Sequence, residues 1–322
     1  MKLAINGFGR IGRIFFRQAY QQPDIDIVAI NDLGSKENLL YLLKYDSVYG
    51  RYDKNPKDIQ FFQEKNPANL PWGDLGIEVV VESTGVFTSY ETAKAHLDAG
   101  AKRVVISAPA DGEVETTLVG VNDDKFANAK PITCNASCTT NSVAPVLAIL
   151  QEHFGVEKAG MITAHGYTAN QNLVDGPNER DMRRGRAAAV NIVPSTTGAA
   201  KAVIQSLPML EGKFDATAIR IPTVTGSLSV VTALLGKKTS VEEINTIFEH
   251  AAAESRWANV LKTTRDPIVS TDIIGEPYGA IIDLTLTKVI GGNLVKVFSW
   301  YDNEWGYCAT LLKHVEALRQ LL

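Results

Sequence analysis

Cysteine and histidine are scarce in this sequence, which contains three cysteines and five histidines among 322 residues. Three cysteines cannot build the disulfide framework of a small secreted domain. The sequence also shows no signal-peptide pattern and no apolar run long enough to span a bilayer. We therefore expect a cytoplasmic protein that has no membrane partner.

A dominant charge of one sign is also missing. The chain has 32 Lys and Arg residues against 36 Asp and Glu residues, which gives a net charge of -4. This balance argues against nucleic acid as the primary partner, although local basic clusters can still bind phosphate. We find no internal repeat and predict no metal site. A chain of this length is expected to form two domains, each with its own core.

What the sequence does contain is a polar motif, Asn135-Ala136-Ser137-Cys138-Thr139-Thr140-Asn141, which leads into an apolar run. Apolar residues recur there at three- and four-residue steps, which predicts a helix from about Thr139 toward Gly155. Cys138 would then lie just before a helix N-terminus, where free N–H groups and the helix dipole favour a thiolate. Cys138 is a candidate nucleophile, and Ser137 and Thr139 suit a polar substrate. The alternative is a small buried thiol.

A glycine-rich turn follows the first predicted strand, Lys2 to Asn6. The turn reads Gly7-Phe8-Gly9-Arg10-Ile11-Gly12 and opens a helix. In such a turn the first glycine permits the bend, the second lets the backbone approach a pyrophosphate, and the third lets the helix pack on the strand. Gly7, Gly9, Arg10, Ile11 and Gly12 are therefore candidate cofactor-binding residues.

A carboxylate follows the next predicted strand, Asp26 to Asn31. Asp32 stands twenty positions after Gly12, where it would accept hydrogen bonds from an adenosine ribose and repel a 2′-phosphate. The spacing predicts NAD in preference to NADP. A turn residue or a helix cap is the alternative for Asp32.

Two further buried strands, Ile77 to Val81 and Arg103 to Ile106, end in small polar residues. Thr84, within Ser83-Thr84-Gly85, and Ser107 lie at the carboxyl ends of these strands, where open α/β sheets bind ligands. Both residues are candidates for the dinucleotide site.

The second half of the chain has longer strands and fewer helices. Strands are expected within Gly160 to Thr168, Asp215 to Leu235, and Gly279 to Asp302 with a turn at residues 291–293, and a helix over Val241 to Ala253. Long strands joined by hairpin-like turns predict a mostly antiparallel sheet with helices on one face. The fold class is therefore α/β, with an N-terminal Rossmann domain and an α+β second domain.

His165 is the candidate partner of Cys138, because it alone among the five histidines ends a predicted strand. As an imidazolium it would stabilise a thiolate, and as a neutral base it would accept a proton during oxidation. A structural histidine is the alternative. The loop from Ala169 to Val190 adds Arg180, Arg183, Arg184 and Arg186, which form either a solvated or subunit-contacting loop or a phosphate site.

The motif Ala-Ser-Cys-Thr-Thr-Asn around Cys138 resembles the nucleophile motif of the phosphorylating glyceraldehyde-3-phosphate dehydrogenases, and the resemblance runs essentially end to end. It implies domains at 1–137, with helix 303–322 packing back on the first, and at 138–302. It also implies the substrates glyceraldehyde 3-phosphate and inorganic phosphate, the cofactor NAD, and a homotetramer.

The resemblance further assigns residues to the two phosphates and to the nicotinamide. Arg220 and Thr168 would bind the substrate phosphate, Thr197 and Gly198 the attacking phosphate, and Arg184 a phosphate near the loop. Asn303 would hold the nicotinamide carboxamide, with Tyr307 behind the ring. Phe87 would line the NAD pocket, and Pro177 matches the NAD-type form.

Some positions depart from the family pattern. The region from Arg51 to Pro67 looks shorter, Asn170 replaces an acidic or hydroxyl residue, and Ser142 replaces a second cysteine. Erythrose-4-phosphate dehydrogenase is the alternative within the enzyme class, and a nucleotide-binding protein without turnover is the alternative outside it.

Overall fold

The chain was analysed as a computed structural model that describes residues 1–54, 56, 58–179 and 181–322. It divides into two compact units. The first contains Met1–Ser137 and Cys308–Leu322, and the second contains Cys138–Tyr307.

The first unit is built on a parallel sheet of seven strands in the order β5-β2-β1-β6-β7-β9-β8. The strands are β1 Lys2–Asn6, β2 Asp26–Asn31, β5 Gln60–Phe62, β6 Val79–Glu82, β7 Arg103–Ile106, β8 Glu115–Thr116 and β9 Ile132–Cys134. The chain order reverses between β1 and β6, so their carboxyl ends border the crevice where open α/β sheets bind ligands. This is the predicted Rossmann-like arrangement.

Short helices surround that sheet, and a small hairpin accompanies it. The helices are α1 Arg10–Ala19, α2 Lys36–Lys44, α3 Trp72–Leu75 and α4 Tyr90–Asp98, and the hairpin is β3 Tyr45–Asp46 with β4 Gly50–Arg51. The region expected to be a trimmed surface element also contributes the edge strand β5. Residues 55 and 57 of that region lie outside the described part of the chain.

The second unit contains a mixed sheet in the order β11-β12-β10-β13-β17-β15-β14, with β16 paired to β17. Its strands are β10 Val156–Gly166, β11 Val193–Ser195, β12 Phe214–Ile221, β13 Ser227–Leu235, β14 Leu261–Thr264, β15 Ala280–Asp283, β16 Lys288–Ile290 and β17 Leu294–Tyr301. Only the pairs β10–β12 and β14–β15 are parallel among those described, so the sheet is mostly antiparallel, as predicted.

One feature of this sheet differs from the expected hairpins. The run from Asp215 to Leu235 forms β12 and β13, but β10 lies between them, parallel to β12 and antiparallel to β13. The turn at residues 291–293 does join β16 and β17 as a hairpin. The parallel pairing of β10 with β12 sets His165 directly opposite Arg220.

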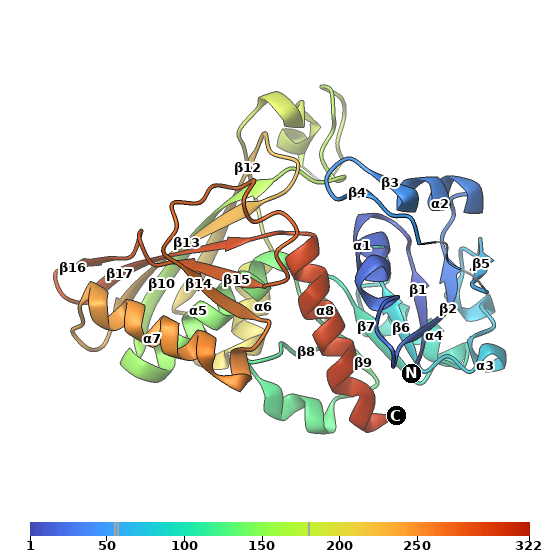
Figure 1. The fold of residues 1–322 in the computed structure, drawn as a ribbon, viewed down its shortest axis with the longest axis horizontal. Coiled ribbons are helices and arrows are strands. Elements are labelled where there is room, and N and C mark those ends of the chain that lie inside the picture. Colours follow the sequence, from blue (N-terminus) through green and yellow to red (C-terminus); the bar gives the residue numbers. More distant parts are fainter. Residues whose placement is uncertain (55, 57, 180) are drawn as a thin grey trace. The chain divides into compact units, whose positions relative to one another are not determined.

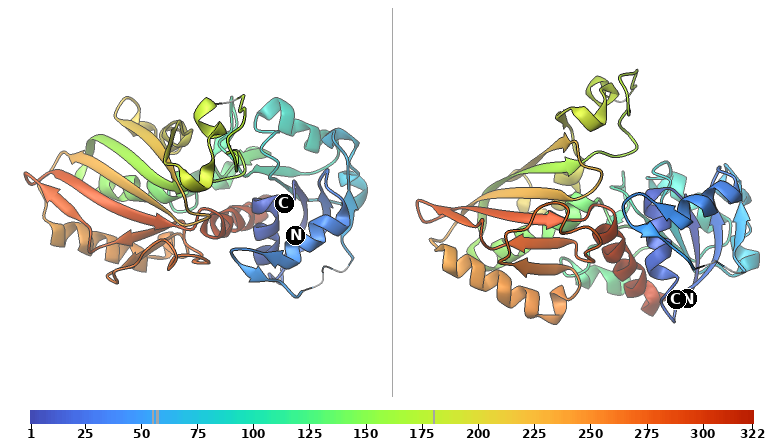
Figure 2. Two further views of the ribbon diagram at one scale, coloured as in Figure 1. Left: turned by 90° about the horizontal axis from the view of Figure 1, so that it is seen from above. Right: turned by 45° about the horizontal axis from the view of Figure 1, so that its top comes forward.

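Three helices of the second unit cover one face of its sheet (Figure 1): α5 Cys138–Phe154, α6 Ala199–Ser206 and α7 Val241–Ala253. The views in Figure 2 show α7 on that face from other directions. Helix α8, Trp305–Ala317, begins in the second unit and continues into the first, where a 3₁₀ turn at Leu318–Leu321 replaces the expected last helical turn. None of the helices described here combines the length and apolar character needed to cross a membrane.

Candidate active site

Cys138 is the first residue of α5, one residue earlier than the predicted helix start. The turn that delivers it contains Ala136 with a positive φ of 52°, a left-handed conformation that is costly for a residue with a side chain. This turn sets Cys138 at the N-terminal end of α5. Its Sγ lies 3.4 Å from His165 Nε2.

His165 is buried near the end of β10, and its other ring nitrogen has two competing neighbours. His165 Nδ1 lies 2.7 Å from Gly166 O and also 2.7 Å from Arg220 Nη1. A protonated Nδ1 donates to the Gly166 carbonyl and leaves Nε2 free to accept a proton from Cys138. An unprotonated Nδ1 accepts from Arg220, which can only donate, and the proton then sits on Nε2.

Burial and nearby charges act in opposite directions on Cys138 and in the same direction on His165. Burial raises the pKa of the Cys138 thiol, while the charge of Arg220 and hydrogen bonds from Thr139 and the backbone at the helix start lower it in part. Burial, aided by Arg220, lowers the pKa of His165 to about 3. Burial thus acts against the expected thiolate, whereas Arg220 and the helix start act in its favour.

Tyr301, on β17, contacts residues around the pair and was not singled out from the sequence. Its hydroxyl lies 3.0 Å from Thr139 Oγ1 and 2.8 Å from Thr163 Oγ1, and its ring meets His165 edge-on at 5.9 Å. Burial raises the pKa of Tyr301 to about 12, so the phenol stays protonated. A lone tyrosine at the end of an apolar strand gives no sequence signal for such contacts.

The candidate phosphate residues lie on β12, on the loop before β11 and after β11. Arg184 Nη2 donates to Thr196 O at 3.2 Å, which ties the loop to the segment that carries Thr197 and Gly198. Thr197 Oγ1 accepts from Ala199 N, and Gly198 is the N-cap of α6.

Thr168 and Asn170, at the start of the loop, are hydrogen-bonded to each other. Thr168 Oγ1 donates to Asn170 Oδ1 at 2.8 Å, so Asn170, which departs from the family pattern, contacts a candidate phosphate-binding residue directly. Arg180 lies outside the described residues. At the second-cysteine position of the motif, Ser142 Oγ lies 2.8 Å from Ser299 Oγ, a buried contact.

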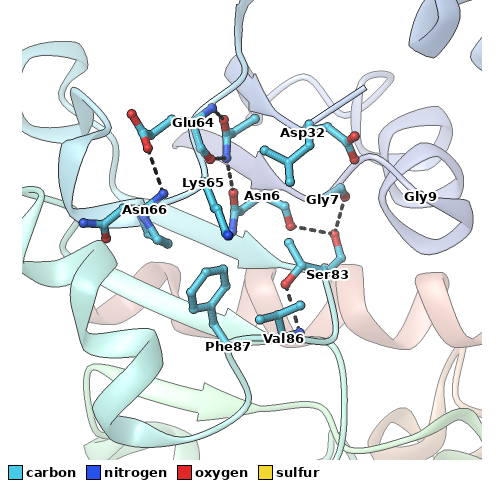
Figure 3. A pocket seen from close by; sticks show the side chains of 14 residues that line it. Asn6, Gly7, Gly9, Asp32, Glu64, Lys65, Asn66, Ser83, Val86 and Phe87 are labelled. Atoms are coloured by element: carbon cyan, nitrogen blue, oxygen red, sulfur yellow. Dashed lines mark hydrogen bonds between the residues drawn. The ribbon is translucent and has the colours of Figure 1, made fainter. Parts of the chain in front are cut away.

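A cavity of about 690 Å³ opens at the carboxyl ends of β1, β2 and β6 in the first unit. Its lining includes Gly7, Gly9, Asp32, Thr84 and Phe87. Figure 3 shows Asn6 near its centre, with the Glu64–Asn66 segment above and Val86 and Phe87 below. Arg10, Ile11, Gly12 and Ser107 lie outside this lining, within the described part of the chain.

Asp32 already has two backbone partners. Its Oδ2 accepts from Phe8 N at 2.7 Å and its Oδ1 accepts from Gly34 N at 2.8 Å. The carboxylate therefore orders the glycine-rich turn as well as facing the cavity. The turn-residue and ribose-binding interpretations are compatible.

The three glycines of the turn have different surroundings. A Cβ on Gly7 would lie 2.6 Å from Thr84 N, and one on Gly12 would collide with the carbonyl oxygen of Gly7. A Cβ on Gly9 would meet no atom of the protein within 4 Å. Gly7 and Gly12 are thus required by the protein's own packing, whereas Gly9 leaves open space beside the cavity, as a bound pyrophosphate requires.

Asn303 and Tyr307 belong to the second unit. The Asn303 carbonyl oxygen Oδ1 accepts from Ser227 Oγ at 2.9 Å and from Gly226 N at 3.1 Å. These donors fix the direction of the amide, so its NH₂ group is the end offered to a ligand. Tyr307 is buried. No group of three or more potential metal ligands occurs among the described residues.

Both parts of the chain match models of known protein domains. Residues 1–90 match the glyceraldehyde 3-phosphate dehydrogenase NAD binding domain, and residues 137–303 match the glyceraldehyde 3-phosphate dehydrogenase C-terminal domain. Among curated proteins, glyceraldehyde-3-phosphate dehydrogenase of Mycobacterium avium is 51% identical over 330 residues, covering 97% of this chain and 96% of that protein. The enzyme of the same name from Clostridium acetobutylicum is 47% identical over 327 residues, with 97% and 96% covered. The chain belongs to the glyceraldehyde-3-phosphate dehydrogenase family.

Proposed function

We propose that Cys138 and His165 carry out the chemistry of this NAD-dependent glyceraldehyde-3-phosphate dehydrogenase. The observation that supports it most directly is the 3.4 Å approach of Sγ to Nε2 in a partly buried setting. As Sγ attacks the aldehyde carbon, Nε2 accepts the thiol proton and returns it to the carbonyl oxygen, which gives a hemithioacetal.

During oxidation His165 acts a second time. Nε2 takes the proton from the hemithioacetal oxygen as the hydride leaves the same carbon, and a thioester to Cys138 remains. Inorganic phosphate then attacks the thioester carbon, the C–S bond breaks, and the products are 1,3-bisphosphoglycerate and free Cys138. A neutral imidazole is the form that this role needs, and the lowered pKa of His165 supplies it.

Two phosphate positions are proposed beside this pair. Arg220 and Thr168 bind the phosphate that the substrate carries, while Thr197, Gly198 and Arg184 bind the phosphate that attacks. A substrate phosphate that engages Arg220 draws its guanidinium from His165 Nδ1. That movement favours the tautomer in which Nδ1 donates to Gly166 O and Nε2 is free to accept a proton.

Ser137 and Thr139 frame the substrate beside the sulfur in this proposal. Thr139 does so from a buried position in which its hydroxyl meets Tyr301.

The residues of the first unit fit NAD, which accepts the hydride in this reaction. The backbone at Gly7, Gly9, Arg10, Ile11 and Gly12 would hold the pyrophosphate, Asp32 the adenosine ribose, and Thr84 and Ser107 the nicotinamide half. The family resemblance adds Asn303 and Tyr307, which belong to the second unit, as residues for the nicotinamide. The open space at Gly9 is the feature of the structure that supports this assignment best.

We further propose functional domains at residues 1–137 and 138–302, with residues 303–322 joining the first, and a cytoplasmic homotetramer. The loop residues Leu173, Met182 and Val190 support the assembly, since these large apolar side chains are mostly exposed in the single chain.

One assay tests the proposed function. NADH formation should be measured with glyceraldehyde 3-phosphate and with erythrose 4-phosphate, each with and without inorganic phosphate. We expect phosphate-dependent turnover that is far faster with the first aldehyde. Preference for erythrose 4-phosphate without a need for phosphate would contradict the assignment of Thr197 and Gly198.

A further inference from the structure

A buried carboxylate lies under the dinucleotide cavity and takes no part in the proposed chemistry. Glu82 ends β6 with 1% of its surface exposed. Its Oε2 accepts from Asn6 Nδ2 and its Oε1 accepts from Thr84 N and Thr84 Oγ1. The described residues provide no lysine or arginine partner for it, so neutral donors alone satisfy this charge.

His96, on α4, completes the set of donors, and its protonation is fixed by Trp72. The indole Nε1–H of Trp72, which can only donate, lies 3.0 Å from His96 Nδ1. Nδ1 therefore carries no proton, and the Nε2–H of a neutral imidazole faces Glu82 Oε2 at 3.1 Å. Residues from α3 and α4 thus hold the carboxylate in place.

From Glu82 a hydrogen-bonded chain of defined direction runs to one wall of the cavity. Because a carboxylate only accepts, Asn6 must turn its NH₂ toward it and its oxygen toward Asn31 Nδ2, at 2.7 Å. Asn31 in turn donates to Glu64 O and accepts from Glu64 N, both at 2.9 Å. This series of hydrogen bonds therefore fixes the backbone that leads into Lys65 and Asn66, above Asn6 in Figure 3.

The other oxygen, Glu82 Oε1, is connected to the opposite wall of the cavity, at residues 84–87. Thr84 Oγ1 donates to Glu82 and is thereby left to accept from Val86 N at 3.0 Å, which sets the turn that carries Val86 and Phe87. The ring of Phe87 also meets His96 edge-on at 6.1 Å. Both walls thus depend on one buried charge.

We propose that Glu82 is a positioning residue for the dinucleotide: its carboxylate sets the direction of the hydrogen bonds that fix the 64–67 and 84–87 walls of the cavity. The inference rests on the proposed function, in which this cavity holds the adenosine side of NAD. Glutamine has nearly the same shape, but its NH₂ group would face the donors of either Asn6 or Thr84. Glu82→Gln would therefore reverse or break the chain without creating a void.

The test measures NAD and AMP binding by calorimetry, and thermal unfolding, for the full chain. Thr133→Val is the matched control, since it removes a buried 2.8 Å contact with His314 in the same unit, and neither residue belongs to the cavity lining. We expect both variants to unfold at lower temperature, but only Glu82→Gln to raise the Kd for both ligands, by about tenfold, the value of one buried hydrogen bond. Unchanged affinity in Glu82→Gln, or equal weakening in Thr133→Val, would overturn the inference.

A charge-exchange variant guards against a merely structural effect. In Asn6→Asp/Glu82→Gln the carboxylate moves from position 82 to position 6 of the hydrogen-bonded series. There it can still accept from Asn31 and from His96, whose Nε2 lies 3.4 Å from Asn6 Nδ2. This variant should bind NAD more tightly than Glu82→Gln, and no recovery would count against the proposal. If Glu82→Gln does not fold, Asn31→Ala can be used in its place, because it removes the hydrogen bond between Asn31 and Asn6 and should weaken AMP binding. Unchanged AMP binding by Asn31→Ala would show that the proposal is wrong.

The wild-type protein separates this inference from the proposed function. Failure of the wild type to bind either NAD or AMP would remove the site assignment itself. Normal wild-type binding with unaffected variants would remove only the role of Glu82.

Discussion

At Cys138 two physical effects oppose each other on one sulfur. Burial favours the thiol, whereas the α5 start and the charge of Arg220 favour the thiolate. In the proposed mechanism the nucleophile is generated by proton transfer to His165. The proposal therefore couples Arg220 to the reactivity of Cys138 as well as to substrate binding.

The first prediction concerns Arg220. Arg220→Met removes the charge that lowers the pKa of Cys138, so that pKa should rise further. Alkylation of Cys138 by neutral iodoacetamide at pH 7 should become about threefold to tenfold slower, and its pH midpoint should move upward. Arg265→Met, which breaks an exposed ion pair with Glu249, is the control and should leave the rate unchanged. A midpoint that stays or falls in Arg220→Met speaks against this coupling.

The second prediction concerns the sulfur. Cys138→Ser should lower turnover by several orders of magnitude while NAD affinity stays within about twofold, because a hydroxyl is a far poorer nucleophile and the dinucleotide cavity lies in the other unit. Mass spectrometry after brief iodoacetate treatment should find the label on Cys138, since Cys134 and Cys308 are buried. Loss of folding in the serine variant would instead favour a structural thiol.

At the scale of elements, two glycines of the turn differ in what surrounds them: Gly12 packs against the backbone of Gly7, whereas Gly9 borders open space. The third prediction compares alanine substitutions at these two positions. Gly12→Ala should lower the unfolding temperature markedly, since its Cβ would collide with the Gly7 carbonyl. Gly9→Ala should unfold near the wild-type temperature but bind NAD at least tenfold more weakly, because its methyl group enters open space that the pyrophosphate needs. Calorimetric binding and thermal unfolding of both variants decide it. Tight NAD binding by Gly9→Ala would show that the pyrophosphate lies elsewhere.

Elements with strong local patterns could be predicted from the sequence. Strands β1, β2 and β7 and helix α7 occupy their expected residues, and α5 begins within one residue of its expected start. The separation of β12 from β13 by β10 could not be predicted, because alternating burial marks a strand but not its neighbour.

In the candidate site, too, local features could be predicted and long-range contacts could not. The pairing of Cys138 with His165 could be proposed from residue type and local context, whereas the pKa of each depends on burial by distant strands. Likewise, Glu82 looks like an ordinary residue at a strand end. Its partners Asn6 and His96 lie 76 and 14 positions away, and only the fold brings them together.

At the scale of the whole molecule, the segment from residue 169 to residue 192 stands out because its large apolar side chains face solvent. Met182 is 90% exposed, Val190 77% and Leu173 73%, which are unusual values for large apolar side chains on the surface of a protein that has no partner. Covering them in an assembly of four chains would remove this apolar area from water. The proposed homotetramer therefore predicts that the segment lies in a contact between copies.

The fourth prediction tests that contact with a charge. Met182→Glu should shift the protein in sedimentation velocity from four chains to two or one, because burial of an unpaired carboxylate in an apolar contact is costly. Met209→Glu is the matched control: Met209 is 50% exposed but lies outside the segment, so its variant should sediment like the wild type. Since the segment also carries Arg184, the dissociated variant should lose affinity for inorganic phosphate while retaining NAD binding. A Met182→Glu protein that remains tetrameric at low micromolar concentration would place the contact elsewhere, and the exposed segment would then require another partner.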